Sequence, residues 1–114
     1  MSFLSNLFGP PVPGASPRDI QARLNANPAP FVLDVREPVE YRHGHIAGAK
    51  LMPLGEVPRR LNEIPRDREI VLICASGHRS LAAARTLVPA GYKVLNLQGG
   101  MLAWQRAGLP VTKR

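Results

Sequence analysis

The residue with the clearest capacity for chemistry is Cys74, the only cysteine in the 114-residue chain. It follows the apolar run 70–73, and a short polar loop leads from it to a helical pattern that begins at Ser80. The backbone N–H groups of such a loop and the N-terminus of a helix both favour negative charge. The thiolate is the reactive form of cysteine, and such surroundings stabilise it. This order of strand, cysteine, loop and helix predicts a nucleophilic thiolate.

The loop after Cys74 contains residues suited to holding an anion. Gly77 permits a positive φ and close approach of the backbone, and Ser80 is a candidate N-cap for the next helix. Arg79 lies at the expected mouth of the loop, where its guanidinium would bind an oxyanion through paired hydrogen bonds. His78 either stabilises the thiolate or is exposed, and we favour exposure. The alternatives are an inert buried thiol and an ordinary solvated arginine.

Asp34 and Arg36 mark the end of another apolar strand, residues 31–35. If this strand neighbours the one before Cys74, Arg36 would add a second positive charge beside the loop. The alternative is that the two side chains only pair with each other. We interpret His45 as a structural hydrogen-bonding residue and Trp104 as part of the core or of a cleft wall.

A metal site is not expected in this chain. The histidines at positions 43, 45 and 78 do not have the spacing of zinc ligands, and only one cysteine is present. The same cysteine count excludes an internal disulfide, so a reducing compartment, the cytoplasm, suits a working thiol.

Strand and helix patterns alternate along the chain, which predicts an α/β domain with a largely parallel sheet. Residues 9–15 are rich in proline and glycine and are predicted to be a linker. Ser16 and Pro17 form a typical helix start. The expected strands are 31–35, 50–52, 70–73 and 94–97, and the expected helical segments are a turn at 38–43 and helices at 57–64, 80–88 and 101–107. Sites in such sheets form beyond the carboxyl ends of strands, where Cys74 lies.

Composition narrows the classes of partner. The chain has 15 basic and 8 acidic residues, a net charge of +7, but its basic residues are spread out and only 5% of its residues are aromatic. We therefore expect no nucleic-acid partner.

No apolar stretch of the chain approaches the length of a membrane span, about 20 residues. The apolar residues Phe3, Leu4, Leu7 and Phe8 form either one helical turn packed on the domain or a flexible docking tail.

Five motifs in this order together resemble the rhodanese family of sulfurtransferases. They are Asp34-Val-Arg-Glu37, Gly44-His-Ile-Ala-Gly-Ala49, Cys74-Ala-Ser-Gly-His-Arg-Ser80, Gly91-Tyr92 and Leu97-Gln-Gly-Gly-Met-Leu-Ala-Trp104. The resemblance implies a rhodanese-like α/β fold, with a five-stranded, mostly parallel sheet and helices on both faces. It also implies one rhodanese-like domain at residues 16–114, preceded by an apolar segment and a linker at residues 1–15.

The resemblance further implies the roles of the site residues. Cys74 would carry sulfur as a persulfide, with Arg79 and Arg36 as anion contacts and Asp34 as a supporting residue. The backbone cradle would be formed by Ala75, Ser76, Gly77, His78 and Ser80. Neither a cofactor nor a metal would be needed. A small anionic donor such as thiosulfate would supply the sulfur, and cyanide, a thiol or a protein would accept it.

Two other classes of function compete with this interpretation. Phosphatases or arsenate reductases of the same fold also use a cysteine and an arginine, but their loop has five residues between the two. This chain has four, Ala75 to His78, which forms a narrower cradle suited to a sulfur atom. The other alternative is a non-catalytic binding or sulfur-relay module, although such modules typically lack the cysteine.

Overall fold

The computed structural model describes residues 12–114. The apolar N-terminal residues, for which a packed turn or a docking tail was predicted, lie outside this range. Among the described residues, no helix has the length and apolar character needed to cross a membrane.

Five parallel strands form one sheet with the order β1-β5-β4-β2-β3. The middle strand, β4, pairs with β5 on one side and β2 on the other, and all four of its residues are buried. An uninterrupted apolar run of this kind suits a strand that is covered on both faces. The strands are β1 (Gly14–Ala15), β2 (Phe31–Asp34), β3 (Lys50–Leu51), β4 (Ile70–Ile73) and β5 (Val94–Leu97).

The first strand, β1, lies inside the segment that was predicted to be a linker, so this part of the prediction is wrong. The carbonyl of Pro13 accepts a hydrogen bond from the Asn96 N–H at 2.9 Å, and that of Ala15 accepts one from the Gln98 N–H at 3.0 Å. A strand of Gly14 and Ala15 has no apolar pattern. It is defined only by backbone pairing with the edge of β5, which needs no particular side chains.

The helical segments are α2 (Pro17–Leu24), α3 (Pro38–Arg42), η1 (Leu54–Glu63), α4 (His78–Leu87) and α5 (Gly100–Arg106). The predicted start of α2 is confirmed, because the Ser16 hydroxyl accepts a hydrogen bond from the Asp19 N–H at 3.2 Å. The segment η1 starts earlier than predicted and is a 3-10 helix rather than an α-helix. It contains Pro58, which has no N–H to donate, and a kink at Arg60.

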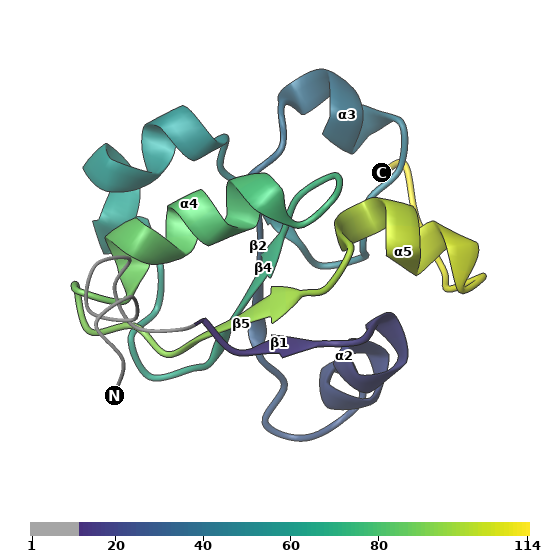
Figure 1. Cartoon of the computed structure of the whole chain (residues 1–114), viewed down its shortest axis with the longest axis horizontal. Coiled ribbons are helices and arrows are strands. Elements are labelled where there is room, and N and C mark those ends of the chain that lie inside the picture. The colour runs from purple at the N-terminus through teal and green to yellow at the C-terminus, as the bar shows by residue number, and fades with distance from the viewer. Residues whose placement is uncertain (1–11) are drawn as a thin grey trace, which may run out of the picture.

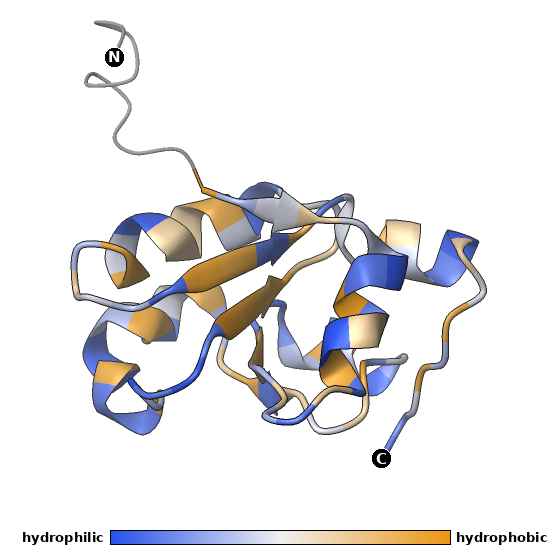
Figure 2. Ribbon diagram, turned by 90° about the horizontal axis from the view of Figure 1, so that it is seen from below, coloured by the Kyte–Doolittle hydropathy of each residue, from blue (hydrophilic) through white to orange (hydrophobic). Residues whose placement is uncertain are grey.

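Helices cover both faces of the sheet, as expected. In Figure 1, α4 and η1 lie to one side of the strands and α2 and α5 to the other, while α3 sits near the loop that joins β4 to α4. Figure 2 shows that the central strands are mostly hydrophobic, whereas the helices alternate between hydrophobic and hydrophilic residues. One core layer therefore includes Leu72, Ala84 and Leu87, and the other includes Ile20, Val71 and Trp104.

Candidate active site

Cys74 lies directly after β4, at the carboxyl end of the middle strand. Its side chain is buried, with 1% of the residue exposed, and its Sγ accepts a hydrogen bond from the Gly77 N–H at 2.9 Å. Helix α4 begins at the next residue, His78, so its N-terminus faces the sulfur. Gly77 has a φ of +100°, which confirms the need for a glycine at this position. Backbone dipoles therefore surround Cys74 Sγ on the side of the loop.

The cradle, residues 75–80, has a polar rim and a buried interior. Ser76 and His78 are exposed at the rim, and the Ser76 hydroxyl lies 3.0 Å from the His78 Nδ1. His78 is thus exposed, as favoured from the sequence. Ala75 is half-buried, while Gly77 is buried.

Ser80 occupies a different position from the one predicted. It lies within the first turn of α4 rather than at the N-cap, which is Gly77. Its buried hydroxyl accepts a hydrogen bond from the Cys74 thiol at 3.3 Å, and lies within hydrogen-bond distance of the Gly77 carbonyl and of Asn96 Oδ1. The helix starts two residues early because Gly77 already provides the sharp turn. The buried Ser80 hydroxyl therefore contacts Cys74 Sγ and helps to hold it in place.

Helix α5 is hydrogen-bonded to the backbone of Cys74 and of Ala75, the first residue of the cradle. The N–H groups of Met101 and Leu102 donate hydrogen bonds to the carbonyls of Cys74 and Ala75, at 2.8 and 3.0 Å. This close approach requires Gly100, because a Cβ there would lie 2.6 Å from the carbonyl carbon of Ala75. The contacts turn these two carbonyls towards α5.

Arg79 is paired with Glu40 across the mouth of the cradle. Its two terminal nitrogens each lie 2.7 Å from one oxygen of the Glu40 carboxylate. The side chains are 35% and 32% exposed, so both reach solvent. The hydrogen bonds from Arg79 lower the pKa of Glu40 to about 2, and those bonds also raise the pKa of Arg79.

Arg36 does not reach into the cradle. Its side chain is buried and donates hydrogen bonds to both oxygens of Asp34, at 2.9 to 3.2 Å, and to the carbonyls of Gly44 and Glu40, at 2.9 and 3.3 Å. The expected second anion contact at Arg36 is therefore replaced by the alternative, internal pairing. Asp34 therefore supports Arg36 directly. The physical reason is burial, since a buried guanidinium needs a carboxylate and carbonyl partners.

The remaining polar and aromatic residues considered from the sequence are structural. His45 is buried, its Nδ1 lies 2.7 Å from the Tyr41 carbonyl, and its ring stacks on Tyr41 at 3.5 Å. Trp104 is buried, and its indole N–H donates to the Pro110 carbonyl at 2.9 Å. Within residues 12–114, no group of three or more histidine, cysteine or carboxylate side chains is arranged to hold a metal ion.

Three residues of the site were missed from the sequence: Glu40, Asn96 and Gly100. Signals for each of them were present. Glu40 stands three residues after Glu37, the spacing of a capping box, and its Oε1 accepts the Glu37 N–H at 2.9 Å. Asn96 is a polar residue in an apolar strand, and Gly100 is half of a glycine pair before a helix. None of these signals specifies a contact with the loop.

The comparisons of this chain with known proteins agree on one family. A model of the rhodanese-like domain matches residues 16–107. A protein from Allochromatium vinosum named sulfurtransferase is 45% identical over 82 residues, which cover 71% of this chain and 77% of that protein. A Bacillus subtilis protein named putative sulfur carrier protein YrkF is 42% identical over 94 residues, 82% of this chain. The match spans only 51% of YrkF, so this chain is similar to about half of it.

Solved structures show the same similarity in three dimensions. The crystal structure of a rhodanese-related protein from Thermoplasma volcanium superposes with a TM-score of 0.84 at 32% sequence identity. The superposition covers 90% of this chain and 99% of that chain. The similarity thus extends over most of the chain.

Proposed function

Because this chain belongs to the rhodanese-like domain family, we propose that it transfers sulfane sulfur through a persulfide on Cys74. The observation that carries the proposal is the hydrogen bond from the Gly77 N–H to Cys74 Sγ, at 2.9 Å, with the N-terminus of α4 behind it. This arrangement favours an anionic sulfur, both before and after it has gained a second sulfur atom. The names of the relatives, sulfurtransferase and sulfur carrier, support the same class of function.

The first half-reaction loads Cys74. Its thiolate attacks the outer sulfur of a donor such as thiosulfate, and a new S–S bond forms. The S–S bond of the donor breaks, and its electron pair leaves with sulfite. The product is a persulfide anion, so one negative charge stays in the cradle, where the loop N–H groups and the helix dipole compensate it.

The second half-reaction unloads the persulfide. A nucleophile, either cyanide or a thiolate, attacks the terminal sulfur, and the electron pair of the S–S bond returns to Cys74. Atoms and charges balance in both halves, so the residues of the chain suffice for the chemistry. Because Cys74 is 1% exposed, small reagents have the best access to its sulfur. We extend the proposal to a protein acceptor and to a reducing, cytoplasmic setting for the thiol.

Intact-mass measurement tests this function. Treatment with thiosulfate should add the mass of one sulfur atom to the wild-type chain, and cyanide should then remove it. Cys74→Ser should abolish both changes while leaving the circular dichroism spectrum of the folded protein unchanged, because serine cannot form a persulfide. A mass gain that persists in Cys74→Ser, or no gain in the wild type from either thiosulfate or a monoanionic sulfur donor, would refute the proposal. The latter result would favour the phosphatase or non-catalytic alternatives.

A further inference from the structure

The mouth of the cradle carries an arginine whose charge is already neutralised. We propose that Glu40 is a specificity-determining residue that weakens the attraction of Arg79 for dianions. The site would then favour sulfur donors with a single negative charge, such as the persulfide of a small thiol, over dianionic thiosulfate. This inference rests on the proposed sulfur transfer and names the class of donor for that same site.

The Arg79–Glu40 pair has the geometry of a strong ion pair. Both contacts are 2.7 Å and use the two terminal nitrogens of the guanidinium, the arrangement in which arginine and carboxylate match best. Glu40 is held in place independently, because its Oε1 also accepts the Glu37 N–H at 2.9 Å in the first turn of α3. Its pKa of about 2 keeps it ionised at neutral pH. An incoming anion must therefore compete with an ordered carboxylate for Arg79.

The second arginine expected near the sulfur offers no compensation. Arg36 is paired with Asp34 and bonded to two carbonyls, so both arginines have a carboxylate partner. What remains to attract an anion is the partial charge of the loop N–H groups and the N-terminus of α4, equivalent to about half an elementary charge. The attraction to this partial charge grows in proportion to the charge of the anion, whereas the cost of removing the anion from water grows with the square of its charge, so the site suits one negative charge better than two.

The charge balance of the reaction agrees with this class of donor. When the Cys74 thiolate attacks the outer sulfur of a small-molecule persulfide, a new S–S bond forms and the donor S–S bond breaks. The electron pair leaves with the inner sulfur as a thiolate, which takes a proton from water. The approaching donor carries one negative charge at most, whereas thiosulfate brings two towards Glu40.

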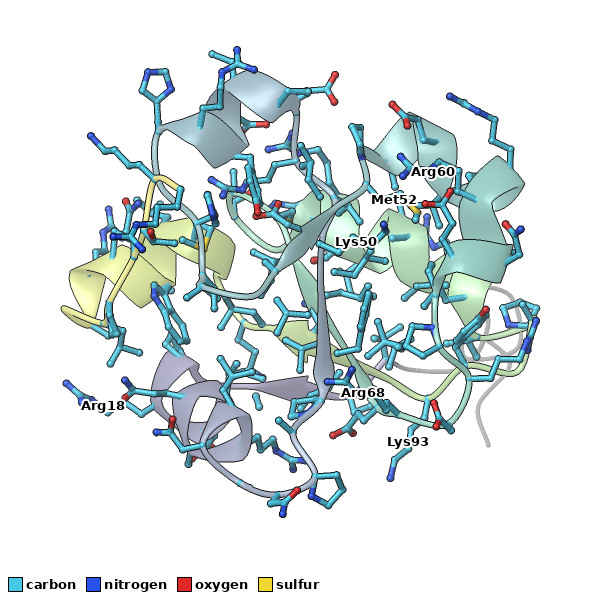
Figure 3. All side chains as sticks on the ribbon, turned by 180° about the vertical axis from the view of Figure 1, so that it is seen from behind. Arg18, Lys50, Met52, Arg60, Arg68 and Lys93 are labelled. Atoms are coloured by element: carbon cyan, nitrogen blue, oxygen red, sulfur yellow. The ribbon has the colours of Figure 1, made fainter. Side chains whose placement is uncertain are left out.

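The decisive variant is Glu40→Gln. Glutamine keeps the carbonyl oxygen that accepts the Glu37 N–H, so the start of α3 is preserved, but it removes the charge opposite Arg79. The matched control is Glu63→Gln. Glu63 binds Arg60 through two contacts, from Nε at 2.7 Å and from a terminal nitrogen at 2.9 Å, and Figure 3 shows Arg60 on η1, a separate element from α3 and α4. Both variants therefore lose one negative charge from a two-point arginine–carboxylate pair.

The first measurement compares two donors that differ in charge. Thiosulfate and methanethiosulfonate both offer a terminal sulfur bonded to an oxidised sulfur, but the former is a dianion and the latter a monoanion. Glu40→Gln should raise kcat/KM for thiosulfate relative to methanethiosulfonate by about fivefold, since a charge-assisted contact at a half-exposed site becomes available. Glu63→Gln should leave this ratio unchanged. The double variant Glu40→Gln with Arg79→Ala should lose the gain.

The second measurement does not depend on sulfur transfer. Iodoacetate and iodoacetamide alkylate Cys74 with similar size but different charge, so the ratio of their rates reports the electrostatics at the sulfur. Glu40→Gln should raise this ratio, and Glu63→Gln should not.

Three outcomes would overturn the inference. An unchanged donor ratio in Glu40→Gln, with normal persulfide formation, would refute it and leave the proposed function intact. An equal loss with both donors would assign Glu40 a purely structural role. Failure of the wild type to gain sulfur from either donor would refute the proposed function and the donor class together, even if the alkylation ratio still changed.

Discussion

Two arginine–carboxylate pairs near the sulfur have the same chemistry but opposite surroundings. The side chains of Arg36 and Asp34 are 6% and 0% exposed, whereas those of Arg79 and Glu40 are 35% and 32% exposed. Both arginines were expected from the sequence to contact an anion. The comparison shows that burial, rather than residue type, decides whether an arginine can exchange its carboxylate for a ligand.

The buried pair is a structural clamp. Arg36 joins the end of β2 to α3 and to Gly44 through its bonds to Asp34 and to two carbonyls, one of which belongs to Glu40. Opening this pair would leave charges without partners in the interior. The pair at the mouth can exchange partners because solvent and ligands reach it. The clamp thereby also positions the backbone of Glu40, the residue that neutralises Arg79.

The largest expected effect comes from breaking the clamp. Asp34→Ala leaves the buried Arg36 guanidinium without its carboxylate, and we expect a loss of about 3–5 kcal/mol in the free energy of unfolding. Urea denaturation followed by circular dichroism measures it. A loss below about 1 kcal/mol would mean that the buried Asp34–Arg36 pair stabilises the fold no more than an exposed pair does, and would contradict the comparison.

A much smaller effect is expected from the pair at the mouth. Glu40→Gln should lower the free energy of unfolding by no more than about 1 kcal/mol at neutral pH, because solvent screens the pair and glutamine keeps the bond to the Glu37 N–H. The same denaturation experiment applies. If Glu40→Gln destabilised the protein as strongly as Asp34→Ala, Glu40 would be part of the structural clamp rather than an adjustable partner of Arg79.

The smallest effect is the pH dependence of the stability difference between Glu40→Gln and the wild type. The pKa of Glu40 is lowered from 4.5 to about 2 in the folded protein, so its contribution to stability is fully present above pH 4.5. It declines as the pH falls from 4.5 towards 2. The stability of Glu40→Gln and of the wild type should therefore differ by a constant amount between pH 7 and 5 and converge below pH 4.5. Convergence already at pH 6 would contradict the lowered pKa.

Local patterns were sufficient for much of the fold and for the nucleophile. The apolar runs before Asp34 and Cys74 and the run at β5 are strands, because short continuous apolar runs suit a sheet covered on both faces. The position of Cys74 between such a run and Gly77 predicted its place beside a helix N-terminus. Each of these inferences depends on neighbours in sequence.

Contacts between distant segments could not be predicted in the same way. Glu40 and Arg79 are 39 residues apart, and Ser80 and Asn96 are 16 apart. The strand β1 pairs with β5 without any side-chain pattern, and Gly100 is required only because α5 approaches the loop. The signals for these residues were local caps, a polar residue in a strand and a glycine pair, which do not identify a partner.

The amino-acid sequence by itself determined the α/β order, the nucleophile and the glycine-dependent turn beside it, because these follow from hydrophobic periodicity and backbone conformation over a few residues. Only the tertiary structure decided which carboxylate each arginine binds, that Arg36 is buried while Arg79 is not, and that Ser80 and α5 support the sulfur. Electrostatic partnerships and desolvation depend on distances through space, and those are set when the strands assemble in the order β1-β5-β4-β2-β3.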